Sequence, residues 1–195
     1  MMSQSNTEFT ESRWTIKTAQ ESDINDLIEM RLALQRYLEE RNSNIWRMSS
    51  ECHERLNEQI IQNLDDKDTC ILVAIHVPPC NGRTEDSDCK IIAMATGTIN
   101  FHRYRIPSTI ACIENVFVKE EFRRNGVGMA LVSKLCQFFA SRCVNDISVK
   151  YVIGNEEAEC FWEKIGFQSR IITAGTNLHD LGLKGLNNFK KPVKL

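Results

Sequence analysis

A glycine-containing turn between a strand-like segment and a helix-like segment constrains this chain more than any other feature. The turn is Arg123-Arg124-Asn125-Gly126-Val127-Gly128; the apolar run 110–118 precedes it and the apolar run 129–140 follows it. Glycine lets the backbone bend and approach a ligand closely because no Cβ intervenes. The first turn of the following helix has N–H groups without helical acceptors, and its dipole favours an anion. With two arginines beside it, the turn predicts a pyrophosphate site.

Two well-known classes of pyrophosphate site fit the turn poorly. A dinucleotide-binding fold places G-x-G-x-x-G near the start of a βαβ unit, whereas Leu131 occupies the third glycine position here and the turn lies well past mid-chain. A nucleoside-triphosphate loop requires Gly-Lys-Ser/Thr, which is absent. An ordinary turn with solvated arginines is a further alternative, because short motifs also occur by chance.

Two segments of the chain resemble the signatures of the GNAT superfamily of N-acetyltransferases. The spacing R-x-x-G-x-G in residues 123–128 resembles the family's acetyl-CoA-binding segment. Residues 155–167 resemble its second signature, N-x-x-A-x-x-F-Y-x-K-x-G-F. The two segments follow one another in the family's order. The resemblance covers about residues 13–173 and is strongest from Cys112 to Phe167.

The second segment also has the pattern of a capped amphipathic helix. Asn155 is a good N-cap, acidic residues fill the first turn, and Gly166 is a good C-terminal stop. Ala158, Phe161 and residues 162 and 165 recur at helical spacing and form one apolar face.

Hydrophobic periodicity and turn residues predict alternating strands and helices, and hence one α/β domain over residues 13–173. Strands are expected at 13–19, 70–77, 91–101, 110–118, 147–153 and 167–173. Helices are expected at 23–41, from Ser49 or Ser50 to about Leu64, at 126–142 and at 155–165. Residues 1–12 read as a disordered lead, 78–90 as a polar loop, and 174–195 as a tail whose leucines at 178, 181, 183 and 186 are compatible with an edge strand.

The family resemblance implies a GNAT-like fold, with a mixed central sheet and helices on both of its faces. The strands ending at Val118 and Ile153 would lie parallel and splay apart, and the pantetheine arm of acetyl-CoA would enter the gap. The residues implied to bind acetyl-CoA are Val116, Phe117, Val118, Arg123, Arg124, Asn125, Gly126, Val127, Gly128, Met129, Asn155, Ala158 and Phe161. Plain core packing is the alternative role for Val116 and Val118.

Acetyl transfer to an amine requires that the ammonium group first lose a proton. A lysine-like amine has a reference pKa of about 10.4, so a base or a desolvated pocket must assist. Glu114 is the candidate base, because polyamine acetyltransferases of this family carry a glutamate four residues before the position of Val118. Strand alternation would place Glu114, Val116 and Val118 on one face. A charge at the rim of the sheet, or one that only attracts a cationic substrate, is the alternative.

Trp162 departs from the family pattern, which usually has a tyrosine whose hydroxyl protonates the leaving thiolate. An indole N–H donates a hydrogen bond but does not give up its proton. The acid is then elsewhere or is water, and Tyr151 is one substitute. The resemblance implies transfer of an acetyl group from acetyl-CoA to a primary amine of a small molecule or peptide. The alternative is a non-catalytic acyl-CoA-binding or sensing module.

The family resemblance implies an acceptor site built mainly by the first two helices, in about residues 31–56, and by the late strands. Trp46 and Arg47 in that region would bind a planar or acidic group; a helix-packing anchor and a solvated charge are their alternative roles. Composition narrows the partners further. A net charge of −2 disfavours a nucleic-acid partner. No apolar run is long enough to span a bilayer, and no signal core begins the chain, which favours the cytoplasm and no membrane partner. The sequence is compatible with a monomer and with a homodimer.

The chain has eight cysteines without a C-x-x-C pair or zinc-finger spacing to histidine. Reduced thiols packed as small hydrophobes are therefore expected, and no metal site. Cys80 and Cys89 bracket the polar loop, but a cytosolic protein would keep them reduced.

Overall fold

The computed structural model describes residues 13–77 and 89–176. The expected disordered lead, nearly all of the polar loop, and the edge strand of the tail lie outside these residues. The chain divides into two compact units, one ending at Phe161 and the other beginning at Trp162. The first unit contains the sheet and every helix except the last turn of α4.

Five strands form one mixed sheet in the order β1-β2-β3-β4-β5. The first four strands pair antiparallel with their neighbours, whereas β5 runs parallel to β4. The strands are β1 Arg13–Thr18, β2 Thr69–Val77, β3 Lys90–Phe101, β4 Thr109–Val118 and β5 Ile147–Val149. The α-helices are α1 Ile24–Arg41, α2 Cys52–Asp65, α3 Val127–Ser141 and α4 Glu156–Lys164, with short 3₁₀ turns at Glu21–Asp23 and Glu120–Phe122.

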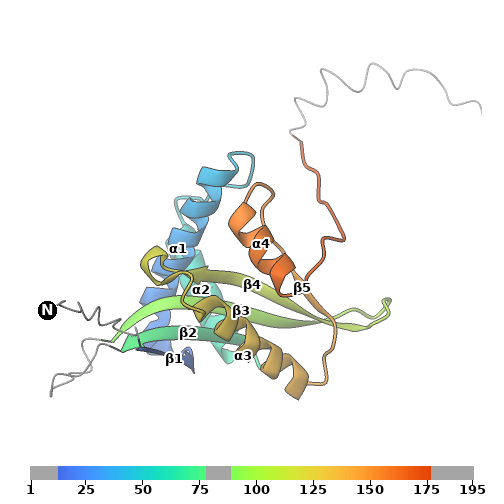
Figure 1. Cartoon of the computed structure of the whole chain (residues 1–195), viewed down its shortest axis with the longest axis horizontal. Helices are drawn as coiled ribbons and strands as arrows, with labels where there is room; N and C mark the ends of the chain where they lie inside the picture. Colours follow the sequence, from blue (N-terminus) through green and yellow to red (C-terminus); the bar gives the residue numbers. More distant parts are fainter. Residues whose placement is uncertain (1–12, 78–88, 177–195) are drawn as a thin grey trace, which may run out of the picture. The chain divides into compact units, whose positions relative to one another are not determined.

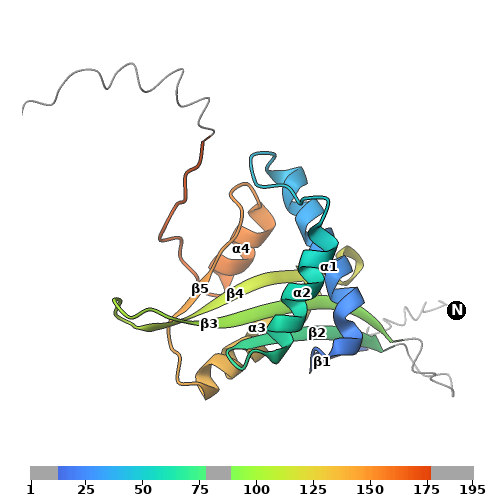
Figure 2. The same ribbon diagram turned by 180° about the vertical axis from the view of Figure 1, so that it is seen from behind.

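Helices cover both faces of the sheet, as the sequence predicts. Figure 1 shows α3 on the near face, and Figure 2, from behind, shows α1 and α2 on the other. On the α1/α2 face, Leu27 and Leu56 join Met94 in one buried apolar cluster. On the α3 face, a Cβ at Gly97 would lie 2.6 Å from Cζ of Phe139, so this glycine allows α3 to pack close to β3.

Two of the predicted strands differ in the structure: one is shorter and the other does not form. β5 stops at Val149 rather than continuing to 153, because the chain turns away toward α4 through Gly154, whose φ is +89°. Residues 167–173 form no strand. Phe167 N–H instead donates to the Trp162 carbonyl at the end of α4, and Ile171 is 89% exposed, so this segment has no buried face to pair.

The strand β4 contains a bulge at Asn115. Glu114 pairs with Thr96 and Phe117 pairs with Met94, so two residues of β4 oppose a single residue of β3. Asn115 has a φ of 38°, in the left-handed region that asparagine tolerates better than most residues. Such a bulge bends its strand and disturbs the alternation of side chains.

The bulge overturns the expectation that Glu114, Val116 and Val118 share one face. Phe117 packs on the α1/α2 cluster, and Glu114, paired two residues along β3, lies on that same face. Val118 lies beside the start of α3, where its Cγ2 would be 3.7 Å from a Cβ on Gly128. Period two fails here because one extra residue enters the strand between them.

Candidate functional site

β4 and β5 pair over only three residues each, Ala111–Ile113 with Ile147–Val149. β4 then continues through residues 114–118 with no strand on that side in the described sheet. The two strands are parallel, as expected, and separate after Val149. Apart from the Val118 carbonyl, which accepts from Arg123, the main-chain groups along this edge of β4 have no strand partner among the described residues, as binding of an extended ligand requires.

The glycine-containing turn forms the start of α3. Arg124 and Gly126 have φ values of 63° and 79°, and the Gly126 carbonyl accepts from Ala130 N–H at 3.0 Å. The N–H groups of Val127 and Gly128 have no acceptor in the described part of the chain. Nothing lies within 4 Å of a Cβ built on Gly126, so the turn faces open space rather than other residues. These are features that an anion site at a helix start requires, and the anion site itself stays a prediction.

Gly128 lies between the end of β4 and the first part of α4. A Cβ on Gly128 would lie 3.7 Å from the ring of Phe161 and from Val118 Cγ2. The structure thus brings together three residues from the two motif segments and the central strand. Their contacts with a cofactor stay a prediction, as do those of the exposed Asn125 and Met129.

The side chain of Arg123 is engaged within the protein. Its Nε donates to the Val118 carbonyl at 3.1 Å, and its Nη1 donates to Glu157 Oε2 at 3.3 Å. Its guanidinium carbon also lies 4.8 Å from the ring centroid of Tyr37, a cation–π geometry. Arg123 therefore ties the end of β4 to α1 and to the first turn of α4. Arg124 makes no ion pair among the described residues.

Tyr37 and Glu157 form the second half of this cluster. The Tyr37 hydroxyl donates to Glu157 Oε2 at 2.6 Å. Burial raises the pKa of Tyr37, and the neighbouring carboxylate raises it further, so the hydroxyl keeps its proton. The same hydrogen bond lowers the pKa of Glu157, with Arg123 contributing in the same direction.

We expect Glu157→Gln to lower the free energy of unfolding at neutral pH. A carboxylate with a lowered pKa in the folded state stabilises the protein above its unfolded pKa, and this contribution is lost as the pH falls through the folded value. Urea unfolding from neutral pH to below about 4, the ordinary range of glutamate, measures it. The difference from wild type should vanish at the acid end. Glu156→Gln, in the same helical turn, is the control, and an equal loss there would contradict the specific role of Glu157.

Asn155 caps α4 as expected. Its Oδ1 accepts from Ala158 N–H at 3.3 Å, while its own N–H donates to the Val152 carbonyl at 3.1 Å. Asn155 is buried, so it holds the helix start in place. A contact between Asn155 or Ala158 and a cofactor stays a prediction.

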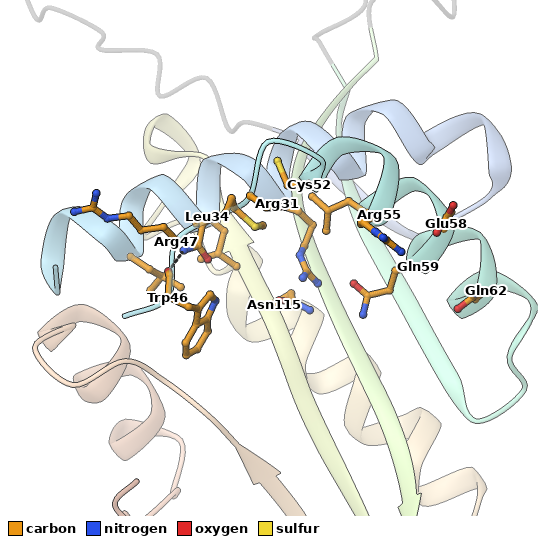
Figure 3. Close-up of a pocket in the computed structure, with 15 residues that line it drawn as sticks. Arg31, Leu34, Trp46, Arg47, Cys52, Arg55, Glu58, Gln59, Gln62 and Asn115 are labelled. Atoms are coloured by element: carbon orange, nitrogen blue, oxygen red, sulfur yellow. Dashed lines mark hydrogen bonds between the residues drawn. The ribbon is translucent and has the colours of Figure 1, made fainter. Parts of the chain in front are cut away.

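A cavity of about 640 Å³ lies between α1, α2 and the loop that joins them, and Asn115 of β4 also lines it (Figure 3). Most of its lining falls within residues 31–56, where the sequence places the acceptor. Gln35 is fixed there, because its Nε2 donates to Glu39 at 2.8 Å and to the Trp46 carbonyl at 2.9 Å. Trp46 is 70% exposed, so much of its indole remains accessible.

The expected base lies on this side of the sheet. Glu114 is exposed and interacts electrostatically with Arg31 of α1. Burial raises the pKa of the neighbouring Cys112 thiol, which disfavours the thiolate that a nucleophile needs. Trp162, 5% exposed, packs edge-on against Phe167 at 5.3 Å between ring centroids.

Arg31, Tyr37 and Asn115 were not singled out from the sequence. Arg31 had a signal: it falls four residues from both Leu27 and Gln35, on the buried side of α1, where a cation is unusual. No sequence pattern marked Tyr37 or Asn115. The role of Tyr37 depends on its contact with α4, and that of Asn115 on the pairing of β3 with β4.

Two features are absent from residues 13–77 and 89–176. No group of three histidine, cysteine, aspartate or glutamate side chains there is arranged to hold a metal ion. None of the helices there combines the length and apolar character needed to cross a membrane.

Solved structures with the same fold come from several organisms. A predicted acetyltransferase of Clostridium acetobutylicum, crystallised with acetyl-CoA, is 18% identical with a TM-score of 0.64 over 86% of this chain and 98% of that one. Glucosamine-6-phosphate N-acetyltransferase of Arabidopsis thaliana is 20% identical with a TM-score of 0.60, over 85% and 99%. An aminoglycoside 6'-N-acetyltransferase of Acinetobacter baumannii is 19% identical with a TM-score of 0.61, over 85% and 99%.

A comparison with curated protein sequences found no significant match. The model of the acetyltransferase (GNAT) family matches residues 35–167, which include the glycine-containing turn, the central strands and the α4 segment. The mixed sheet, the separation of β4 from β5 and the turn at α3 agree with that match. This chain therefore belongs to the GNAT family of acetyltransferases.

Proposed function

We propose that this protein transfers an acetyl group from acetyl-CoA to a primary amine of a small molecule or peptide. One observation supports this most directly: β4 borders both halves of the site. Its open edge at 114–118 leads toward the α3 turn, and its bulge residue Asn115 lines the cavity. A donor held along that edge would present its acyl group near the cavity.

The residues of the α3 turn fit a pyrophosphate. Within residues 13–77 and 89–176 the N–H groups of Val127 and Gly128 lack acceptors, and Gly126 leaves open space where a side chain would otherwise stand. The main chain of Val116 and Phe117 would bind the pantetheine arm at the open edge of β4. Arg123 holds the Val118 carbonyl and so positions the end of this edge. Acetyl-CoA supplies an activated thioester.

In this proposal Glu114 is the base that takes a proton from the acceptor. It lies on the α1/α2 face with the cavity, and its carboxylate would receive the proton of the bound ammonium group. The neutral nitrogen then attacks the thioester carbonyl carbon, so that a C–N bond forms, the C–S bond breaks and the electron pair leaves on sulfur. A base matters because a lysine-like amine is almost wholly protonated at neutral pH.

The leaving group needs less help than the nucleophile. A thiol has a pKa of about 8.5, so its thiolate departs readily and can take its proton from water. This makes the reaction compatible with Trp162, which has a donor but no acidic proton. The proposed reaction therefore does not require a tyrosine at position 162.

Thiol release from acetyl-CoA across a panel of amines tests the proposal. We expect release above background with at least one class of acceptor, and mass spectrometry of the product should show one added acetyl group. Absence of release with every class, in protein that acetyl-CoA stabilises against heat, would contradict catalysis.

That contrary result would support a second candidate, a module that binds or senses acyl-CoA without turnover. The tryptophan at position 162 favours it, because the residue cannot act as the usual acid. Binding alone still raises the melting temperature by mass action. The two candidates therefore agree on stabilisation by acetyl-CoA and differ on turnover.

A further inference from the structure

The charged side chains that line the cavity indicate which kind of acceptor would bind there. Its charged lining consists of Arg31, Arg47, Arg55 and a single acid, Glu58. A cavity that selected a purely cationic amine would be expected to have the opposite balance.

The three arginines differ in what they can offer a ligand. Arg55 is already near Glu51, at 3.7 Å, and its side chain is 73% exposed. Arg47 is exposed, and Figure 3 shows its side chain directed away from Arg31. Arg31 is half-buried on α1, and Figure 3 shows its guanidinium directed toward Asn115 and Gln59. Arg31 is thus the arginine that the cavity encloses.

The guanidinium of Arg31 has unused donors. It makes no ion pair and no hydrogen bond among the described residues, and the charge that interacts with it electrostatically is Glu114. Burial lowers the pKa of Arg31, and the interaction with Glu114 acts against that shift. The guanidinium is therefore partly desolvated without a direct hydrogen-bond partner among the described residues, which is unfavourable. Gln35, one helical turn along α1, shows the contrast, since its amide has two acceptors. A half-buried guanidinium whose donors lack acceptors among the described residues is suited to a carboxylate or phosphate.

We propose that the acceptor of this enzyme is an amine that also carries an acidic group, a carboxylate or a phosphate, and that Arg31 binds that group. The inference rests on the proposed acetyl transfer and names its substrate class. Arg31 and Glu114 lie close enough to interact, so one small molecule can place its acidic group at Arg31 and its ammonium group at Glu114. Arg31 is then a specificity-determining residue.

Three short amines test the substrate class: 3-aminopropanoate, 3-aminopropyl phosphate and 3-aminopropanamide, whose amide group is uncharged. We expect kcat/KM to be at least about tenfold higher for one of the acidic probes than for the amide, since tenfold corresponds to about 1.4 kcal/mol. The comparison is conservative, because a nearby anion raises the pKa of an amine and leaves less of it neutral. The better acidic probe identifies the group as carboxylate or phosphate.

Variants at Arg31 test the assignment of the residue. Arg31→Gln should abolish the preference mainly through KM, and Arg31→Lys should retain part of it as a point charge. Arg36→Gln is the matched control, because Arg36 is exposed on the same helix and does not line this cavity. The dissociation constant for acetyl-CoA should be the same in all three, which separates acceptor binding from damage to the fold.

The outcomes separate this inference from the proposed function. Equal or better use of 3-aminopropanamide, or a preference that survives in Arg31→Gln, would overturn the inference and leave acetyl transfer intact. If acetyl-CoA neither stabilises the protein nor releases thiol with any amine, the proposed function fails and the acceptor assignment fails with it.

Discussion

Replacing Glu114 by glutamine should lower kcat for amine acetylation by about 10²- to 10⁴-fold at neutral pH, the usual contribution of a general base. The amide keeps the size of the side chain but accepts no proton. For a lysine-like amine the neutral form costs about 4.6 kcal/mol at neutral pH, so losing the base exposes much of that cost. Steady-state thiol release with saturating acetyl-CoA measures the change.

The pH profile shows whether Glu114 acts as a base or only as an attracting charge. A lost base matters less as the pH approaches the pKa of the amine, so the deficit of Glu114→Gln should shrink at alkaline pH. A lost attraction for a cation would instead raise KM and leave kcat nearly unchanged. Glu54→Gln, at an exposed position of α2 outside the cavity lining, controls for net charge. An unchanged kcat at every pH would refute the role of Glu114.

Gly126→Asp should weaken acetyl-CoA binding on the order of a hundredfold, since two like charges about 4 Å apart near a protein surface repel by a few kcal/mol. A Cβ at position 126 would have no atom within 4 Å apart from its chain neighbours, so the new side chain fits at the turn proposed to hold the pyrophosphate. Titration calorimetry with acetyl-CoA gives the dissociation constant directly.

Gly126→Asn separates charge from backbone strain. The φ of 79° at Gly126 is costly for any side chain, and asparagine and aspartate tolerate this region to a similar degree. The asparagine variant should therefore share the loss of stability and retain most of the affinity. High salt should narrow the gap between the two variants, because surface charges are screened. Equal affinity of wild type and Gly126→Asp would rule out the turn as the pyrophosphate site.

Local sequence patterns were sufficient to predict most of the helices and strands, because the residues that define each element lie close together in the chain. The apolar stripe of α1, the cap at Asn155 and the turn before α3 depend on residues within a few positions of one another. The strand β5 was predicted, but its end was placed four residues too far along, because apolar residues after Val149 continue the strand pattern while the chain leaves the sheet to reach α4.

Long-range partners explain what sequence reasoning missed at the site. Arg123 and Arg124 look alike in the sequence, yet only Arg123 meets Glu157, far along the chain in α4. The bulge has no reliable signature either, because Asn115 becomes a bulge residue only through the register between β3 and β4. Arg31 was discernible, since a cation on the buried stripe of α1 calls for an explanation.

Because of the bulge at Asn115, the number of residues in β4 matters more than their types for which side of the sheet each side chain faces. With a regular strand, position 118 would swing to the side of Glu114 and lose its place against Gly128. For the acetyl transfer proposed here, the extra position lets a single strand carry the proposed base Glu114 on one side and contact the helix proposed to bind phosphate on the other. Shortening this strand by one residue would consequently uncouple donor from acceptor, even though every side chain that takes part in either were kept.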